Sequence, residues 1–184
     1  EEGSVRAGDT VLCLGTGGVS VQAQMIADML GAEVIATSSS DEKLQRALDL
    51  AADEGINYER TPEWGSKVVE ATDGVGVDHV VEVGGAKTLE QSIEAVRIGG
   101  EISLIGVLSG VVEDVGVVPV LMQNICIQGI FVGSREMFEN LNRALESNGV
   151  HPTVDRIFAF DEVRRALEFT ADGRHFGNIA IELT

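Results

Sequence analysis

Short apolar runs alternate with amphipathic stretches along most of the chain, and this pattern predicts its elements. The run from Thr10 to Leu14 stops at a glycine-rich turn, and from Val19 onward the apolar positions follow a helical period. Later runs repeat this change of period, which predicts strands at 10–14, 33–37, 55–57, 77–83, 101–105 and 125–132. The predicted helices cover 19–30, 41–50, 62–71, 88–96 and 134–147, with a short helical turn at 119–124.

Strands that alternate with helices at this pace predict an α/β fold. We expect a Rossmann-type, doubly wound parallel sheet of six strands flanked by helices. In such a sheet the ligand lies beyond the carboxyl ends of the strands. The loops that follow the strands should therefore line one crevice, and they begin at Gly15, Thr37, Val83–Gly84, Ile105 and Val132.

The rhythm of the pattern changes at residue 150. Strand-like segments at 154–158 and 178–183 flank a helical segment at 161–171, and they do not continue the earlier spacing. We therefore expect a Rossmann domain at 1–149 and a short C-terminal α/β tail at 150–184. The pattern leaves open whether this tail packs on the sheet or belongs to a second domain.

The turn after the first predicted strand reads Gly15-Thr16-Gly17-Gly18-Val19-Ser20. Gly15 suits a tight turn, and Gly17 has no Cβ that would keep a pyrophosphate from the backbone. The first amides of the following helix, at Gly18 to Ser20, are unpaired donors at the positive end of the helix dipole. Ser20 replaces the Gly or Ala that usually ends this motif. The turn predicts a dinucleotide site, and the alternative is a glycine-rich turn that binds nothing.

The end of the second predicted strand distinguishes between the two nicotinamide dinucleotides. NAD-binding domains usually place an acidic residue there to bond the ribose 2′-hydroxyl, whereas this chain has hydroxyls at Thr37, Ser38, Ser39 and Ser40. Lys43 follows in the first turn of the next helix, where a bound anion would offset its unfavourable position on the helix dipole. We expect a 2′-phosphate, hence NADP(H), although Asp41 and Glu42 could instead neutralise Lys43. Ser39 and Glu42 also have the spacing of a capping box.

Composition limits the remaining possibilities. The formal net charge of -17 makes nucleic acids and anionic membranes poor partners. No apolar run is long enough to span a bilayer, and the first residues, Glu1 to Gly3, do not resemble a signal peptide. Cys13 and Cys126 lie in strand-like runs without metal-ligand spacing, which fits small buried hydrophobes in a reduced, cytoplasmic protein.

The glycine turn, the run from Val34 to Leu44, the run from Val77 to Gly85, and Ile125 to Ser134 together resemble the cofactor domain of medium-chain dehydrogenases/reductases. The zinc-independent branch, similar to quinone oxidoreductases and often called NADP-dependent alcohol dehydrogenase, matches best. This resemblance implies that Lys43 and Tyr58 hold the 2′-phosphate of NADP(H). It also implies that residues at the carboxyl ends of later strands border the nicotinamide, namely Gly106, Val107, Phe131, Val132 and Gly133.

The resemblance has implications beyond the cofactor. It implies a homodimer formed through the sixth strand, Ile127 to Val132, and an N-terminal catalytic domain of roughly 100 or more residues in a longer protein. The segment from 150 would then return to that domain, and a basic residue near the adenine would come from the region of Arg174, His175 and Asn178. We identify no catalytic residue and expect no zinc in this chain.

These observations predict the NADP(H)-binding domain of an oxidoreductase that transfers hydride between nicotinamide and a small alcohol, carbonyl or quinone substrate. An enoyl-thioester reductase of the same superfamily is an alternative. A second alternative is a sensing module that binds a nucleotide without turnover. A methyltransferase-like domain is less favoured, because it would need an acidic residue where Thr37 and Ser38 lie.

Overall fold

The structure is a computed structural model that describes residues 5–183, so the prediction for Glu1 to Gly3 lies outside the described residues. Its main feature is a parallel sheet of six strands in the order β3-β2-β1-β4-β5-β6. These strands are β1 (Thr10–Cys13), β2 (Glu33–Ser38), β3 (Glu54–Asn57), β4 (Val77–Glu82), β5 (Val96–Leu104) and β6 (Cys126–Gly129). The predicted α/β fold with a Rossmann-type sheet is therefore confirmed.

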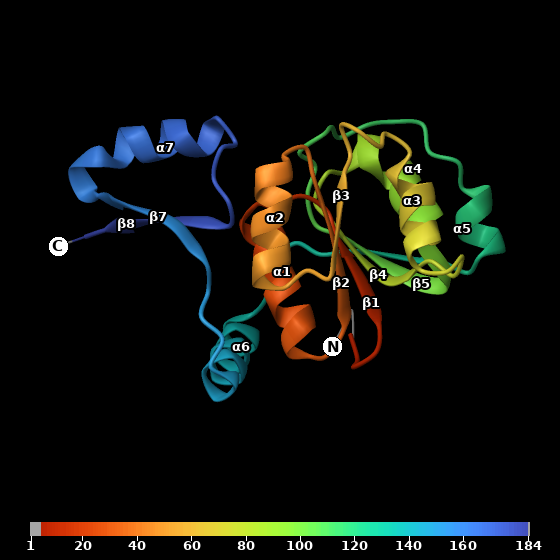
Figure 1. The fold of residues 1–184 in the computed structure, drawn as a ribbon, viewed down its shortest axis with the longest axis horizontal. Helices are drawn as coiled ribbons and strands as arrows, with labels where there is room; N and C mark the ends of the chain where they lie inside the picture. The colour runs from red at the N-terminus through yellow and green to blue at the C-terminus, as the bar shows by residue number, and fades with distance from the viewer. Residues whose placement is uncertain (1–4, 184) are drawn as a thin grey trace.

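Helices cover both faces of this sheet (Figure 1). One face is covered by α1 (Gly18–Met29) and α2 (Asp41–Leu50), and the other by α3 (Trp64–Ala71) and α4 (Ala86–Ala95). The chain also contains a short α5 (Val118–Met122) and a long α6 (Arg135–Asn148), of which only Leu145 is buried. No helix within residues 5–183 combines the length and apolar character that crossing a membrane would require.

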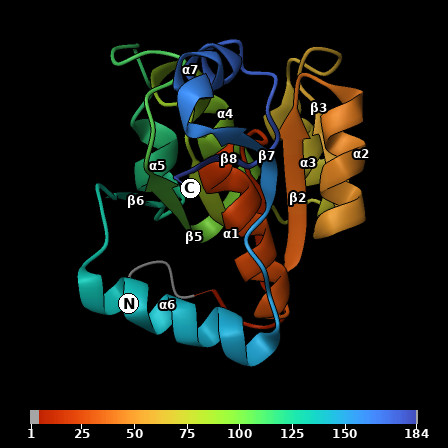
Figure 2. The ribbon, with the colours of Figure 1, turned by 90° about the vertical axis from the view of Figure 1, so that its left-hand side faces the viewer.

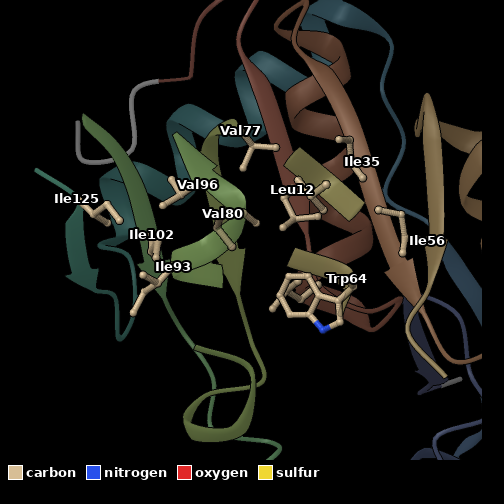
Figure 3. Close-up of a cluster of buried hydrophobic side chains, with 13 residues drawn as sticks. Leu12, Ile35, Ile56, Trp64, Val77, Val80, Ile93, Val96, Ile102 and Ile125 are labelled. Atoms are coloured by element: carbon tan, nitrogen blue, oxygen red, sulfur yellow. The ribbon is translucent and has the colours of Figure 1, made fainter. Parts of the chain in front are cut away.

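The two faces of the sheet carry separate hydrophobic clusters, as the period of two in a strand requires. Leu12 and Val80 point toward α3 and α4, where they pack with Trp64 and Val68 (Figure 3). Cys13 and its neighbours on the opposite face pack against α1 and α2. Burial on both faces explains why β1 and β2 read as mainly apolar runs.

Several helix boundaries follow from local signals. Gly31, the residue after the helix predicted at 19–30, has a left-handed backbone with φ of 82°, which glycine adopts without steric cost. The predicted capping box of Ser39 and Glu42 is wrong, because Ser40 caps α2 by accepting the Lys43 N–H at 3.3 Å. Helix α3 begins at Trp64, after Pro62 rather than with it.

The fifth and sixth strands differ from the prediction. The helix predicted at 88–96 would end just before Gly99 and Gly100, yet α4 ends at Ala95 and Val96 already pairs with Val77 in β5. The glycine pair therefore lies inside a strand, where the pairing register shifts. Strand β6 ends at Gly129 rather than Val132, because its partner β5 ends at Leu104.

The last segment forms its own two-stranded parallel sheet and also contacts the main one. Strands β7 (Val154–Ala159) and β8 (Asn178–Glu182) flank a 3-10 turn (Phe160–Glu162) and α7 (Val163–Ala171) (Figure 2). Phe176 is only 2% exposed and packs in the cluster beneath α1 and α2. Arg46 of α2 lies 4.4 Å above the Phe176 ring and donates to Asp155 of β7 at 2.6 Å. The tail is thus anchored to the helices beside the glycine turn.

Candidate cofactor site at the carboxyl ends of the strands

A cavity of about 350 Å³ opens where β1, β2 and β4 end. Strands β1 and β4 are neighbours there, although the chain leaves β1 toward β2 and β3 and returns to build β4 to β6 on the other side. This reversal of strand order is the usual ligand position in open α/β sheets. The lining residues are Leu14, Gly15, Thr37, Tyr58, Trp64, Val83, Gly84, Thr88, Leu108 and Ser109.

The glycine turn leaves room beside its backbone. Gly15 has φ of +75°, and a Cβ built on Gly15 or Gly17 would meet no protein atom within 4 Å. The first backbone bond of α1 runs from the Val21 N–H to the Gly17 carbonyl at 3.0 Å. The amides of Gly18 and Val19 precede that bond and belong to the open end of the helix. An anion could therefore approach this backbone closely.

Ser20, the residue that departs from the expected motif, has a defined place in the turn. It is 1% exposed, and its hydroxyl donates to the Leu14 carbonyl at 2.5 Å. Gln24, one helical turn later, is fully buried and donates to the Gly15 carbonyl at 3.5 Å. These two side chains of α1 fix the turn to the end of β1, a role that glycine or alanine could not perform.

The tail packs directly against the glycine turn, and sequence reasoning did not identify this contact. Gly177 forms a parallel bridge with Gly17, and its N–H donates to the Thr16 carbonyl at 2.9 Å. A Cβ on Gly18 would lie 2.1 Å from the Asn178 Oδ1 atom. The absence of a side chain at Gly18 is therefore explained by packing against Asn178.

The hydroxyls at the end of β2 have different roles. Thr37 and Ser38 are buried, and Thr37 Oγ1 accepts the Gly15 N–H at 3.1 Å, which connects β2 to the glycine turn. Ser38 Oγ accepts the Ser40 N–H at 3.2 Å. Ser39 is exposed, whereas Ser40 caps the following helix. Of the four predicted hydroxyls, Ser39 is the one most accessible to a ligand.

Lys43 lies at the same end of β2 and contacts the tail. Its Nζ donates to the Gly173 carbonyl at 2.5 Å. Burial lowers the pKa of Lys43 below its usual value, partly offset by the nearby Asp155 carboxylate. Asp41 bonds Arg60 and Asn57, so it does not serve as the direct partner of the Lys43 ammonium. The cation is therefore held in place by an uncharged carbonyl.

Tyr58 approaches the cavity from beyond β3. Its backbone N–H donates to the Ser38 carbonyl at 3.1 Å, and its side chain is 38% exposed. Tyr58 therefore joins Gly15, Thr37, Val83 and Gly84 in one crevice, as the sequence indicated.

The other predicted residues lie farther along the strand ends. Gly106 and Val107 are outside the lining of this cavity, although the next residues, Leu108 and Ser109, are part of it. Phe131, Val132 and Gly133 follow β6 as an exposed segment, with Phe131 95% exposed, and they do not line the cavity. Within residues 5–183 no group of three or more His, Cys, Asp or Glu side chains is arranged to hold a metal ion.

The fold and the glycine-turn crevice are those of a cofactor domain of the medium-chain dehydrogenase/reductase superfamily, as the resemblance implied. Residues 18–147 match the family described as zinc-binding dehydrogenase, and the chain belongs to that family.

The relatives share this region at substantial identity. A zinc-type alcohol dehydrogenase-like protein of Schizosaccharomyces pombe is 43% identical over 100% of this chain and 54% of its own length. A Sinorhizobium meliloti 1021 protein, provisionally called an alcohol dehydrogenase, superposes with a TM-score of 0.92 at 43% identity, covering 99% of this chain and 53% of its own. An NAD-dependent alcohol dehydrogenase superposes with a TM-score of 0.91 at 34% identity, and the match covers 98% of this chain and 52% of that protein. The chain thus spans about half the length of the relatives it matches.

Proposed function

We propose that this chain is the NADP(H)-binding domain of an oxidoreductase. The observation that carries the proposal is the end of β2. No acidic residue of the kind that binds the ribose of NAD ends this strand, and the exposed Ser39 and Tyr58 lie there together with the partly buried Lys43. Lys43 there is held by an uncharged carbonyl rather than by an acidic side chain. A 2′-phosphate would give this ammonium a negatively charged hydrogen-bond partner, in addition to the longer-range attraction of Asp155.

The residues of the crevice fit the parts of a dinucleotide in order along the sheet. The turn from Gly15 to Val19 would hold the pyrophosphate through the open amides of Gly18 and Val19, since the Gly15 N–H already donates to Thr37. The space beside Gly17 would be filled by any Cβ. Thr37 and Ser38 shape the floor, and Ser39, Lys43 and Tyr58 would contact the 2′-phosphate. The nicotinamide would then lie over the opposite half of the sheet, near Val83, Gly84, Gly106 and Val107, with the segment Phe131 to Gly133 beside it.

The bound dinucleotide supplies hydride chemistry, and the residues of this chain would position it. We propose transfer between nicotinamide and a small alcohol, carbonyl or quinone substrate, without zinc held by this chain. The name of one relative, a bovine quinone oxidoreductase-like protein, supports the quinone part of this range. The residues that bind the substrate would lie outside residues 1–184, in keeping with a match that covers 54% of the Schizosaccharomyces pombe relative.

Fluorescence titration of the chain with NADPH and NADH tests the cofactor proposal. A charge-assisted bond contributes roughly 1.5–3 kcal/mol, and releasing the Gly173 carbonyl costs roughly 0.5–1.5 kcal/mol. The net gain of about 1–1.5 kcal/mol should make NADPH bind roughly 5- to 13-fold more tightly than NADH. The NAD-dependent neighbour makes the comparison necessary. Equal affinities, or tighter binding of NADH, would refute the preference for NADP(H).

The exposed edge of the sheet supports a second part of the proposal, a homodimer formed through β6. This strand ends the sheet, and Ile127 is 36% exposed on it, whereas soluble proteins usually cover or blunt such an edge. Light scattering after size exclusion should give twice the mass of 19.5 kDa for one chain. Introduction of a proline at Gly129 should then yield monomers with an unchanged fold by circular dichroism. The next amide, Ile130 N–H, donates to Leu104 of β5, so the Gly129 N–H points away from β5, and proline there removes a donor from the free edge.

A further inference from the structure

The last residue of β4, Glu82, carries a fully buried carboxylate next to the proposed cofactor crevice. One carboxylate oxygen, Oε1, accepts the Gly84 N–H at 2.7 Å, the Gly85 N–H at 2.9 Å and the Thr88 hydroxyl at 2.7 Å. The other oxygen, Oε2, accepts the Ser92 hydroxyl. Burying a charged group is costly unless it is fully hydrogen-bonded, and this carboxylate has partners on both oxygens.

These bonds fix the turn from Val83 to Gly85 in one position. Gly85 precedes α4 and has no side chain to cap that helix, so the Glu82 carboxylate receives the amides of the turn instead. The turn is also tightly packed, because a Cβ on Gly84 would lie 2.3 Å from the Thr88 hydroxyl. Gly85 itself has φ of +90°, a conformation that disfavours other residues.

A second loop is bound to this turn, so the two must move together. The Ser109 N–H donates to the Gly84 carbonyl at 2.7 Å, and the Ala86 N–H donates to the Gly110 carbonyl at 3.1 Å. A Cβ on Gly106 would lie 2.2 Å from the Val83 carbonyl oxygen. The Glu82 carboxylate therefore also fixes the position of the loop from 106 to 110, because that loop is hydrogen-bonded to and closely packed on the turn that Glu82 holds.

The order of the strands places these loops opposite the Lys43 end of the crevice. Strand β1 and the glycine turn are central, β2 and β3 lie on one side, and β4 and β5 lie on the other. If the 2′-phosphate lies at β2 and the pyrophosphate at the glycine turn, the remaining half of the dinucleotide must extend over β4 and β5. The turn from Val83 to Gly85 and the loop from 106 to 110 then form its wall.

We propose that Glu82 is a positioning residue for the nicotinamide half of the cofactor. The proposal rests on the proposed function, since it assumes a dinucleotide in this crevice. Glu82 does not touch the cofactor. It acts by holding the turn from Val83 to Gly85 and the loop from 106 to 110 in the positions that the nicotinamide ring and its ribose require. Its effect should therefore be absent for a ligand that lacks this half.

Titration of NADPH and of adenosine 2′,5′-diphosphate, which lacks the nicotinamide half, tests the proposal in wild-type and variant chains. Glu82→Ala leaves the Gly84 and Gly85 amides without their acceptor. It should lower the affinity for NADPH at least 10-fold while changing the affinity for adenosine 2′,5′-diphosphate less than 2-fold. Glu82→Gln keeps an oxygen for the turn, and its amide can donate to Ser92. It should therefore restore NADPH affinity to within about 3-fold of wild type.

The outcomes separate positioning from general stability. Equal affinity of wild type and Glu82→Ala for both ligands, or an equal loss for both, would overturn the positioning role. If Glu82→Ala does not fold, Glu82→Asp applies the same test, because it keeps the charge and is one methylene too short to reach all four donors. A split between the ligands in Glu82→Asp supports the proposal, and the lack of a split overturns it. A wild-type chain that binds neither ligand refutes the proposed function and this inference with it.

Discussion

Replacement of Lys43 by alanine is the most direct perturbation of the proposed cofactor preference. The change removes the ammonium at the end of β2 and also its bond to the Gly173 carbonyl. NADPH places a phosphate on the ribose where NADH has a hydroxyl, so the two cofactors should respond differently. The variant should weaken NADPH and leave NADH nearly unchanged.

The magnitude follows from the exchange of partners that binding requires. A bond between Lys43 and a phosphate contributes about 1.5–3 kcal/mol, while the bond to the Gly173 carbonyl, which must be given up, contributes about 0.5–1.5 kcal/mol. The difference is about 1–1.5 kcal/mol, which corresponds to a loss of roughly 5- to 13-fold in NADPH affinity. Higher salt should reduce this loss, because mobile ions screen partly exposed charges.

Fluorescence titration of both cofactors at two salt concentrations measures the effect, and Lys67→Ala is the matched control. Lys67 lies on α3, where its ammonium pairs with Glu70 at 3.0 Å, and it is not one of the residues that line the crevice. The control should bind both cofactors as wild type does. Unchanged NADPH affinity in Lys43→Ala, or an equal loss for NADPH and NADH, would refute the assignment of Lys43 to a 2′-phosphate.

Three further predictions concern the turn, the tail and pH. Gly17→Ala should lower stability by less than about 1 kcal/mol, since its Cβ meets no protein atom, yet weaken NADPH more than 10-fold in the same titration. Phe176→Ala should lower the free energy of unfolding in urea by about 3–5 kcal/mol, whereas exposed Phe160→Ala should change it little. Burial raises the pKa of Asp155, but the hydrogen bonds from Arg46 and the Phe176 amide outweigh burial and hold its pKa below the usual value. A depressed pKa stabilises the fold above pH ~4 and the contribution is lost as pH falls further, so Asp155→Asn should show a smaller drop in urea midpoint between pH 5 and pH 3.

The fold could be predicted from the sequence because local and global signals agree. Strands such as β1 and β2 are buried on both faces and read as apolar runs, and glycines such as Gly31 mark helix ends. The errors occurred where a local signal had two readings. Gly99 and Gly100 can end a helix or bend a strand, and only the pairing of Val96 with Val77 distinguishes these cases.

The part of the crevice that could be predicted from the sequence is the part formed by the loops that follow the strands. Gly15, Thr37, Tyr58, Val83 and Gly84 were named from their positions in the pattern or from the family resemblance, and the structure brings them together. Trp64 and Ser109 reach the same cavity from other elements, and neither carries a local motif. Glu82 did carry a signal, a charged residue at the end of an apolar strand just before a glycine pair, but its partners come from tertiary packing.

The sequence did not specify the contacts of the tail, because its pattern left open whether the tail packs on the sheet. These contacts change how the cofactor site should be studied. Gly177 bridges Gly17, Asn178 packs on Gly18, and the Gly173 carbonyl receives the Lys43 ammonium. The tail thus touches the proposed pyrophosphate site and the proposed 2′-phosphate site at once. Removing residues 150–184 would therefore delete Phe176, expose the hydrophobic residues that it covers, and remove the hydrogen-bond acceptor of Lys43 in the same step. A truncated chain would confound stability with cofactor preference, and for this reason point substitutions in the intact chain are the informative experiments.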